Sequence, residues 1–232
     1  MMGSIEYRWF HVVTALFVTA LIVSNIIAVK LFTIGGLVLP AGVILFPVAY
    51  IIGDILTEVY GFARARQVIW TGFFCNLVAV MAIWITGRLT PAPFWTIGIF
   101  DSPEAAQLAY EAILGFAQRL LLASFLAYLV GEFLNSIVLA KLKVRTGGRF
   151  LWMRTIASTV VGEGADSVVF ITIAFWGVFP AYALGQAILS QWFFKVAFET
   201  LATPFTYLVV NALKVSEGVD FYDKDTSFSI IK

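Results

Sequence analysis

The chain has 232 residues, of which 61% are hydrophobic and 12% are charged, and its formal net charge is +1 at pH 7. Soluble domains carry about 25% charged residues, so this composition indicates an integral membrane protein without a sizeable soluble domain, and it gives no sign of a nucleic-acid partner. A single cysteine, Cys75, excludes an intrachain disulfide and a cysteine-cluster metal site, and a single histidine, His11, argues against a histidine-ligated metal.

Six stretches are apolar over about 20 residues, the length that a membrane-spanning helix needs. They are residues 9–29, 41–60, 67–87, 118–140, 156–178 and 186–212. The sequence therefore predicts an all-α membrane protein with six transmembrane helices in a single domain, residues 1–215. Residues 216–232 are predicted to form a polar cytoplasmic tail that frays.

Lysine and arginine gather on one side of the predicted membrane, and such a bias marks the cytoplasmic side. This side holds Arg8, Arg64, Arg66, Lys141, Lys143, Arg145, Arg149, Arg154, Lys214, Lys224 and Lys232. We therefore predict a multi-pass protein of the cell (inner) membrane with both termini in the cytoplasm. The lipid bilayer is its expected environment, and a homodimer is the candidate assembly.

The first predicted span carries Asn25 near its non-cytoplasmic end, where the amide either binds a ligand or hydrogen-bonds to a neighbouring helix. The connection over residues 33–40 has two adjacent glycines between short apolar runs, which predicts a small hairpin or a re-entrant turn. Later in the chain, Ser102 followed by a proline and a glutamate predicts the start of a helix before the fourth span.

The second predicted span contains two acidic residues, Asp54 and Glu58. At about 100° per residue they lie about 40° apart on one helical face. A charge at mid-bilayer costs roughly 2.5–3.5 kcal/mol on insertion scales, so this face should point to a protein interior or a wet cavity. Phe46 and Tyr50 lie on the same span and are candidates for stacking on a flat ligand, although packing alone also explains each of them.

The fourth predicted span places Glu132 and Asn135 on one face, near the middle of the membrane. The two side chains either bind a ligand or join neighbouring helices. The fifth span contains Glu163 and Asp166, three residues apart, with a glycine on each side of Glu163. Two carboxylates at one site favour retention of a proton. Hydrogen bonding between helices is the structural alternative.

The sixth predicted span carries Lys195 and Glu199 one turn apart, ahead of Pro204. The two charges either neutralise each other within the helix or separate, and Lys195 then becomes a partner for Asp54, Glu58 or Glu163. Acidic pairs follow Lys30 and Lys141 at similar distances, which suggests two inverted three-helix halves of the kind that secondary transporters use. Coincidence is the alternative.

Four blocks of the sequence resemble the queuosine precursor transporter family, which was first grouped with vitamin-uptake transporters. The blocks are residues 24–30, 46–66, 157–166 and 195–204. The resemblance covers nearly the whole chain, and the second block is the most specific. It implies a six-helix inner-membrane importer, with no enzymatic activity and no cofactor, for a purine-like small molecule, either 7-cyano- or 7-aminomethyl-7-deazaguanine.

The chemistry of such a ligand suggests roles for the polar residues. A carboxylate can accept both N–H donors of the base edge, so Glu163 or Asp166 is expected to read it, while Asn25 or Lys195 donates to O6. The wider set of predicted substrate-binding residues is Glu163, Asp166, Asn25, Lys195, Phe46, Tyr50, Glu132 and Asn135. Asp54, Glu58 and Glu199 are predicted to bind a coupling proton or to gate.

Two other functions are compatible with the sequence. A substrate-capturing subunit of an energy-coupling-factor importer also has about six helices and binds vitamins, but it usually needs ATPase partners. An intramembrane aspartyl protease also needs two membrane carboxylates, and residues 162–166 are similar to its Gly-x-Gly-Asp signature. The spacing here is one residue too long, and the Tyr-Asp partner motif is absent.

Overall fold

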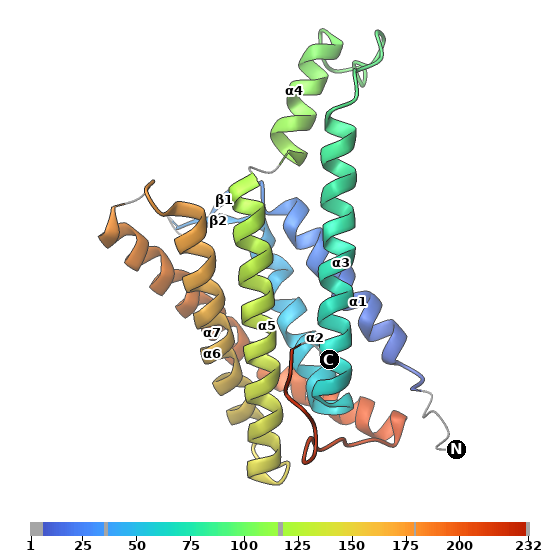
Figure 1. Ribbon diagram of the computed structural model, residues 1–232, viewed down its shortest axis with the longest axis vertical. Coiled ribbons are helices and arrows are strands. Elements are labelled where there is room, and N and C mark those ends of the chain that lie inside the picture. The colour runs from blue at the N-terminus through green and yellow to red at the C-terminus, as the bar shows by residue number, and fades with distance from the viewer. Residues whose placement is uncertain (1–6, 35–36, 116–117, 179, 231–232) are drawn as a thin grey trace.

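The computed structural model describes residues 7–34, 37–115, 118–178 and 180–230, and it is an elongated bundle of helices (Figure 1). The long helices are α1 (Phe10–Ile27), α3 (Phe62–Gly87), α5 (Gln118–Thr146), α6 (Leu151–Phe175) and α7 (Ala181–Glu217). Within the described residues these five are long and apolar enough to cross a membrane. The predicted class, a helical membrane protein, agrees with this architecture.

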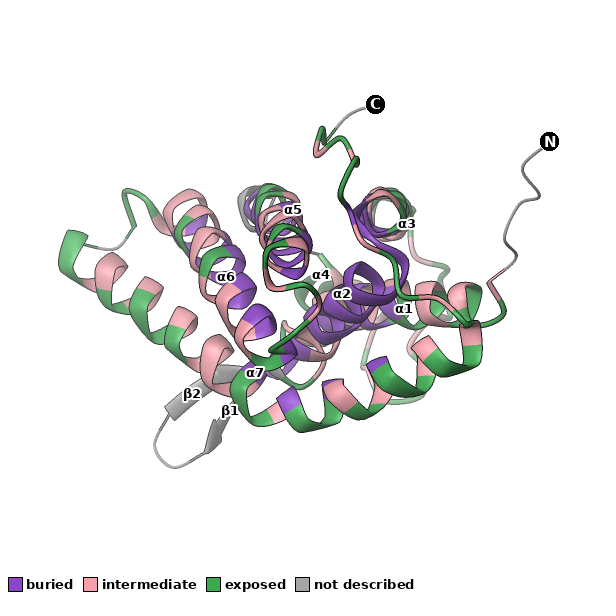
Figure 2. Ribbon diagram, turned by 90° about the horizontal axis from the view of Figure 1, so that it is seen from below, coloured by how far each residue is buried: buried purple, intermediate pink, exposed green. Residues whose placement is uncertain are grey.

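The second predicted span differs from the expectation of a sixth long helix. Its first residues form a short 3-10 turn, η1 (Ala41–Ile44), and only Phe46–Tyr60 form helix α2. Fifteen residues reach about 22 Å, which is shorter than the hydrocarbon core of a bilayer. Six membrane spans are therefore not confirmed. Figure 2 shows α2 as the most completely buried helix of the bundle.

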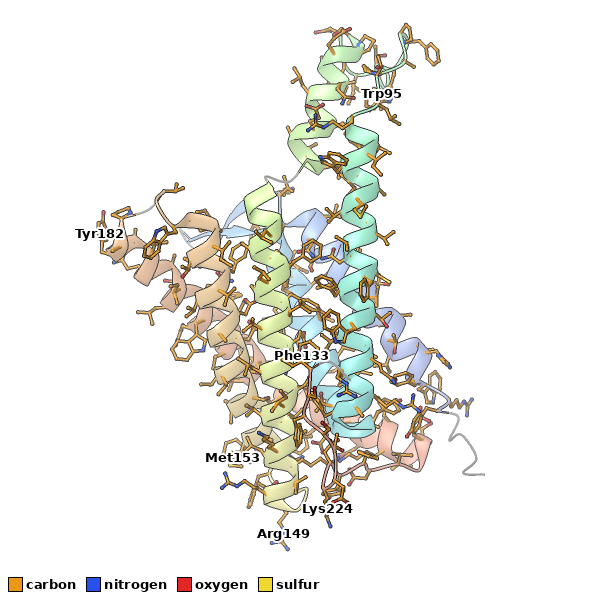
Figure 3. All side chains as sticks on the ribbon, in the orientation of Figure 1. Trp95, Phe133, Arg149, Met153, Tyr182 and Lys224 are labelled. Atoms are coloured by element: carbon orange, nitrogen blue, oxygen red, sulfur yellow. The ribbon has the colours of Figure 1, made fainter. Side chains whose placement is uncertain are left out.

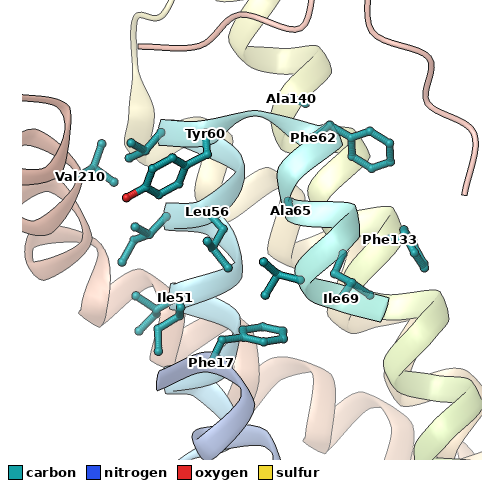
Figure 4. Close-up of a cluster of buried hydrophobic side chains, with 14 of the residues drawn as sticks. Phe17, Ile51, Leu56, Tyr60, Phe62, Ala65, Ile69, Phe133, Ala140 and Val210 are labelled. Atoms are coloured by element: carbon teal, nitrogen blue, oxygen red, sulfur yellow. The ribbon is translucent and has the colours of Figure 1, made fainter. Parts of the chain in front are cut away.

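Helix α2 is enclosed because its neighbours cover it on several sides. It contacts α1, α3, α5 and α7, and every residue from Ala49 to Tyr60 is buried. Its apolar side chains, such as Ile51 and Leu56, pack in one cluster with Phe17 of α1 and Ile69 of α3 (Figure 4). Lipid tails are as apolar as these side chains, so close packing rather than escape from water holds the helices together.

A single residue, Gly61, joins α2 to α3. Its φ of 82° lies in the left-handed region that favours glycine, which lets the chain reverse without a longer loop. A Cβ atom at this position would also overlap the ring of Phe221. The turn brings α2 and α3 side by side (Figure 4). Glu58 lies within one helical turn of the end of α2.

Two shorter predicted elements are confirmed. Strands β1 (Leu31–Ile34) and β2 (Leu37–Pro40) pair antiparallel, so the connection after α1 is a hairpin. Helix α4 (Pro103–Leu114) begins where the capping sequence predicted, because the Ser102 hydroxyl accepts the backbone N–H of Ala105 at 3.2 Å. Helix α4 lies beside the far end of α3, beyond the rest of the bundle (Figure 1).

The opposite end of the bundle, where α5 connects to α6, is called the basic end here because cations gather there. It holds Lys141, Lys143, Arg145, Arg149, Arg154, Lys214 and Lys224. Figure 3 shows Arg149 and Lys224 at this end.

The polar segment after α7, residues 218–230, is called the tail here, and we expected it to fray. It instead lies against the basic end. Asp223 accepts the backbone N–H of Phe62 at 3.0 Å, and Arg66 donates to the carbonyl oxygen of Ser229 at 2.6 Å. Trp70 donates to the carbonyl oxygen of Ile230 at 3.0 Å. These contacts fix the tail on α3.

Candidate functional site

The candidate site is a group of buried acidic side chains around Lys195 of α7. Among the residues that the structure describes, Lys195 is the only basic side chain at its centre. Its ammonium forms an ion pair with Glu163 at 2.6 Å and a hydrogen-bonded ion pair with Asp166. It also lies 5.6 Å from the centre of the Tyr50 ring, a distance suited to a cation–π contact. Both ion pairs cross from α7 to α6. The sequence allowed Lys195 to pair with Glu199 within α7 or with a carboxylate of another helix, and the structure shows pairing between helices.

Asp54 lies in the same region on α2. Its Oδ1 atom accepts a hydrogen bond of 2.5 Å from the side-chain amide of Asn135 on α5, and its side chain is almost fully buried. Glu132 lies about one turn before Asn135 and is equally buried. The charges of Asp54 and Glu199 act on each other, as do those of Glu132 and the Glu163–Asp166 pair.

Five carboxyl groups therefore converge from α2, α5, α6 and α7 around one lysine. This acidic cluster consists of Asp54, Glu132, Glu163, Asp166 and Glu199. Several buried polar atoms in and beside it have no hydrogen-bond partner: Asp54 Oδ2, Glu132 Oε2, Asn135 Oδ1, Thr159 Oγ1, Ser167 Oγ and Glu199 Oε1. An unsatisfied buried polar group costs about 1–3 kcal/mol, so protons, water or a ligand with many donors would stabilise the cluster.

Two glycines set the distance between α5 and α6 at the cluster. A Cβ atom on Gly162 would lie 2.7 Å from the Cβ of Asn135 and 2.8 Å from the carbonyl oxygen of Gly131. A Cβ atom on Gly131 would lie 2.8 Å from the Cβ of Asp166. Real Cβ atoms do not approach so closely. The glycines thus let the two helices bring Asn135 and Asp166 into one site.

We expect Gly162→Ala to lower the stability of the folded protein by about 1–3 kcal/mol, because the added methyl group forces α5 and α6 apart. Gly185→Ala on α7 is the matched control, since nothing lies within 4 Å of a Cβ there and alanine favours a helix. The thermal midpoint in detergent measures both. Equal midpoints for the two variants would show that close helix contact at Gly162 is unimportant.

Glu58 lies one turn from Asp54 but belongs to a different arrangement. Its carboxylate is fully buried and forms ion pairs with Arg154 at 2.8 Å, Lys214 at 2.7 Å and Lys143 at 3.5 Å. Lys143 also donates to the backbone carbonyl of Glu58. Asp220 of the tail completes the group, at 2.6 Å from Lys143 and 2.9 Å from Lys214. These five residues are called the Glu58 network here.

Asp220 lies outside the helices, and its carboxyl group is ionised at neutral pH. Partial burial opposes the charge, but hydrogen bonds from Lys143 and Lys214 outweigh it and hold the pKa of Asp220 below the usual value. The sequence did not reveal the network. Its lysines and arginine occupy span ends, where cations ordinarily set topology, and the only signal was a buried carboxylate close to such an end.

The other predicted binding residues lie away from Lys195 by the contacts that the structure describes. Asn25 accepts a hydrogen bond of 3.4 Å from Ser124, which joins α1 to α5. Phe46 lies at the start of α2, near Gly42 and the end of α1.

A metal ion is held by several ligating side chains at one site. Within the described residues, no three histidine, cysteine, aspartate or glutamate side chains are grouped so as to hold a metal ion.

Comparisons with known proteins find similar sequences among membrane transporters. Residues 40–209 match the family model described as "Putative vitamin uptake transporter". The "Probable queuosine precursor transporter" of Bacillus subtilis (strain 168) is 29% identical over 189 residues, which cover 81% of this chain and 79% of that protein. No solved structure gives a significant match.

Two further relatives carry similar names. The "Queuosine precursor transporter" of Escherichia coli (strain K12) is 27% identical over 67% of this chain and 65% of its own length. The "Probable queuosine precursor transporter" of Haemophilus influenzae (strain ATCC 51907 / DSM 11121 / KW20 / Rd) is 27% identical over 58% of this chain and 51% of its own length. The region that matches the family model, residues 40–209, includes all of α2 and all five residues of the acidic cluster.

Proposed function

Because the chain belongs to the vitamin uptake transporter family, and is thus a membrane transporter rather than an enzyme, we propose that it imports 7-deazaguanine precursors of queuosine. The ligand is 7-cyano- or 7-aminomethyl-7-deazaguanine, and it crosses the cytoplasmic membrane. The basic end, which includes both chain ends in the predicted topology, faces the cytoplasm. The names of the three relatives support this substrate class.

The observation that carries the proposal is the buried pairing of Lys195 with Glu163 and Asp166. A deazaguanine base edge presents adjacent N–H donors that replace the lysine at a carboxylate, while the freed ammonium donates to O6 of the base. The Tyr50 ring, already beside Lys195, offers a face for the flat ligand. Ligand binding thus exchanges one set of ion pairs for charge-assisted hydrogen bonds.

The acidic cluster is closely packed in this structure. Lys195 and Asp166 retain side-chain exposures of 15% and 11%, whereas Glu163 is 2% exposed. A ring system as large as deazaguanine therefore enters only after α6 or α7 moves relative to α2. Such movement of helices around a fixed central site is the usual basis of alternating access.

Protons are the coupling ion in this proposal. Five carboxyl groups face one lysine, and proton binding removes the excess negative charge without further ligands. Asp54 and Glu199 are the assigned proton carriers, because each has a buried oxygen without a hydrogen-bond partner. Asn135 holds Asp54 in place through its hydrogen bond, and Glu132 lines the same region. Glu58 has the gating role.

The direct test is thermal-shift screening of the detergent-solubilised full chain. A ligand at 100 times its Kd stabilises the folded form by about 2.7 kcal/mol, so both deazaguanines should raise the midpoint, whereas guanine and common vitamins raise it less or not at all. Cells that express this chain alone should also take up deazaguanine. Absence of any shift with either deazaguanine would contradict the proposal, and a requirement for ATPase partners would favour the subunit role.

We expect Asp54→Asn to bind deazaguanine with an unchanged thermal shift but to lose the dependence of uptake on an imposed proton gradient. Asparagine keeps the acceptor for Asn135 and removes the titrating group. Uptake into vesicles with and without the gradient measures the effect, with Asp101→Asn in an exposed loop as control. An unchanged gradient dependence in Asp54→Asn would remove Asp54 from the coupling role.

A further inference from the structure

The Glu58 network lies at the inner side of the basic end, and every helix that builds the acidic cluster contributes to both groups. On each helix the network member is the nearer to the basic end. The pairs are Asp54 and Glu58 on α2, Glu132 and Lys143 on α5, Glu163 and Arg154 on α6, and Glu199 and Lys214 on α7. At 1.5 Å per residue the axial separations run from about 6 Å on α2 to about 22 Å on α7.

The centre of the network is closed to solvent. The side chains of Glu58, Lys143 and Arg154 are at most 1% exposed, although two of them carry long cationic groups, whereas Lys214 and Asp220 at its outer edge are 20% and 42% exposed. Arg154 also donates to the Thr146 hydroxyl and to the carbonyl oxygen of Arg149, which ties in the α5–α6 connection. No ligand reaches the basic end past Glu58 while these contacts persist.

The tail adds a second layer over the network. Asp220 holds both Lys143 and Lys214, and the next residue, Phe221, donates its backbone N–H to the carbonyl oxygen of Val59 at 3.3 Å. The Phe228 ring packs on Phe62, with centroids 5.2 Å apart. The tail therefore spans α2, α3, α5 and α7 at the point where they meet.

Resting on the proposed transport function, we propose that the Glu58 network and the tail together form the gate between the acidic cluster and the solvent at the basic end. Lys143, Arg154, Lys214 and Asp220 are its positioning residues, because they act through Glu58 and do not contact the ligand. The gate opens when α6 and α7 withdraw their cations from Glu58. Asp220 leaves with the tail, and the ligand then passes to the basic end.

The first test measures access to the closed region and needs no substrate. Ser158 is fully buried on α6 between Arg154 and Glu163, so Ser158→Cys in a Cys75→Ser background reports whether a membrane-impermeant thiol reagent enters from the basic end. We expect Asp220→Asn to raise the labelling rate at least five-fold. Asp225→Asn, an exposed change in the same tail, should leave it unchanged. Equal labelling of the two tail variants would overturn the gate.

The second test holds the tail in place. Arg66→Cys and Ser229→Cys, at a contact of 2.6 Å, are joined by a short cleavable bifunctional thiol reagent in the Cys75→Ser background. We expect the cross-link to lower the maximal uptake rate at least ten-fold with an unchanged KM and an unchanged thermal shift by the ligand, and cleavage should restore the rate. Full uptake by the cross-linked protein would overturn the gate. Absence of uptake before cross-linking would instead contradict the transport proposal, and the labelling test would still decide the gate.

Discussion

Uptake of deazaguanine should fall about 100-fold in Glu163→Gln, because a charge-assisted bidentate contact is worth roughly 3 kcal/mol and each 1.4 kcal/mol is a factor of ten. Glutamine has the size of glutamate but offers one acceptor and one donor group. It can neither accept both N–H donors of the base edge nor hold the charge of Lys195, whose ammonium lies 2.6 Å from Glu163. Initial rates of uptake by whole cells measure the change.

The same experiment separates loss of binding from loss of folding. Lys195 keeps Asp166 as an ion-pair partner in Glu163→Gln, so the yield of folded protein should remain close to that of the parent chain. Glu111→Gln on the exposed α4 is the matched control for the chemical change. Normal uptake by Glu163→Gln would refute the assignment of this carboxylate to the base edge.

The largest loss of stability is expected from Glu58→Gln. The substitution removes the anion that Lys143, Arg154 and Lys214 share, and breaking a buried ion pair by removing one partner costs about 3–5 kcal/mol. Asp220 partly compensates, since it lies 2.6 Å from Lys143. The thermal midpoint in detergent and the amount of protein in the membrane measure the effect.

A second substitution tests the cause of that loss. Lys214→Met removes one of the unpaired cations, so the double variant Glu58→Gln/Lys214→Met should recover part of the lost stability, which a double-mutant cycle quantifies. Asp101→Asn, an exposed change outside the helices, is the control for loss of one acidic charge. A midpoint for Glu58→Gln equal to that of Asp101→Asn would show that the network does not stabilise the fold.

The five long helices could be predicted from the sequence because a spanning helix must be apolar over about 20 residues, and few other structures require so long an apolar stretch. Helix α2 could not be distinguished from a span by this criterion. Burial among neighbouring helices selects the same apolar side chains as lipid does, and the boundary between η1 and α2 depends on tertiary contacts. This short helix also differs from α6, its counterpart in the proposed inverted repeat, which has 25 residues. The repeat stays a prediction.

For the site, helical spacing predicted that Glu163 and Asp166 share one face, and the structure agrees. Spacing alone allowed Lys195 to pair with Glu199 or across helices, because the choice depends on how closely α6 and α7 approach. A Cβ atom on Gly164 of α6 would lie 3.2 Å from the Trp192 side chain of α7, and such a close contact is visible only once the helices are placed. The position of Glu58 could not be predicted either. Because α2 is short, Glu58 lies beside the cations of the basic end rather than near the middle of a membrane span.

The enclosure of α2 has a consequence for how the chain is made. Synthesis delivers α2 to the membrane long before α5 and α7, which later cover it and supply Lys143 and Lys214. A helix of 15 residues with two acidic groups does not partition stably into lipid on its own. Helix α2 must therefore stay beside the translocon until α7 has been synthesised. Chains truncated within α7 should be recognised by quality-control proteases and degraded.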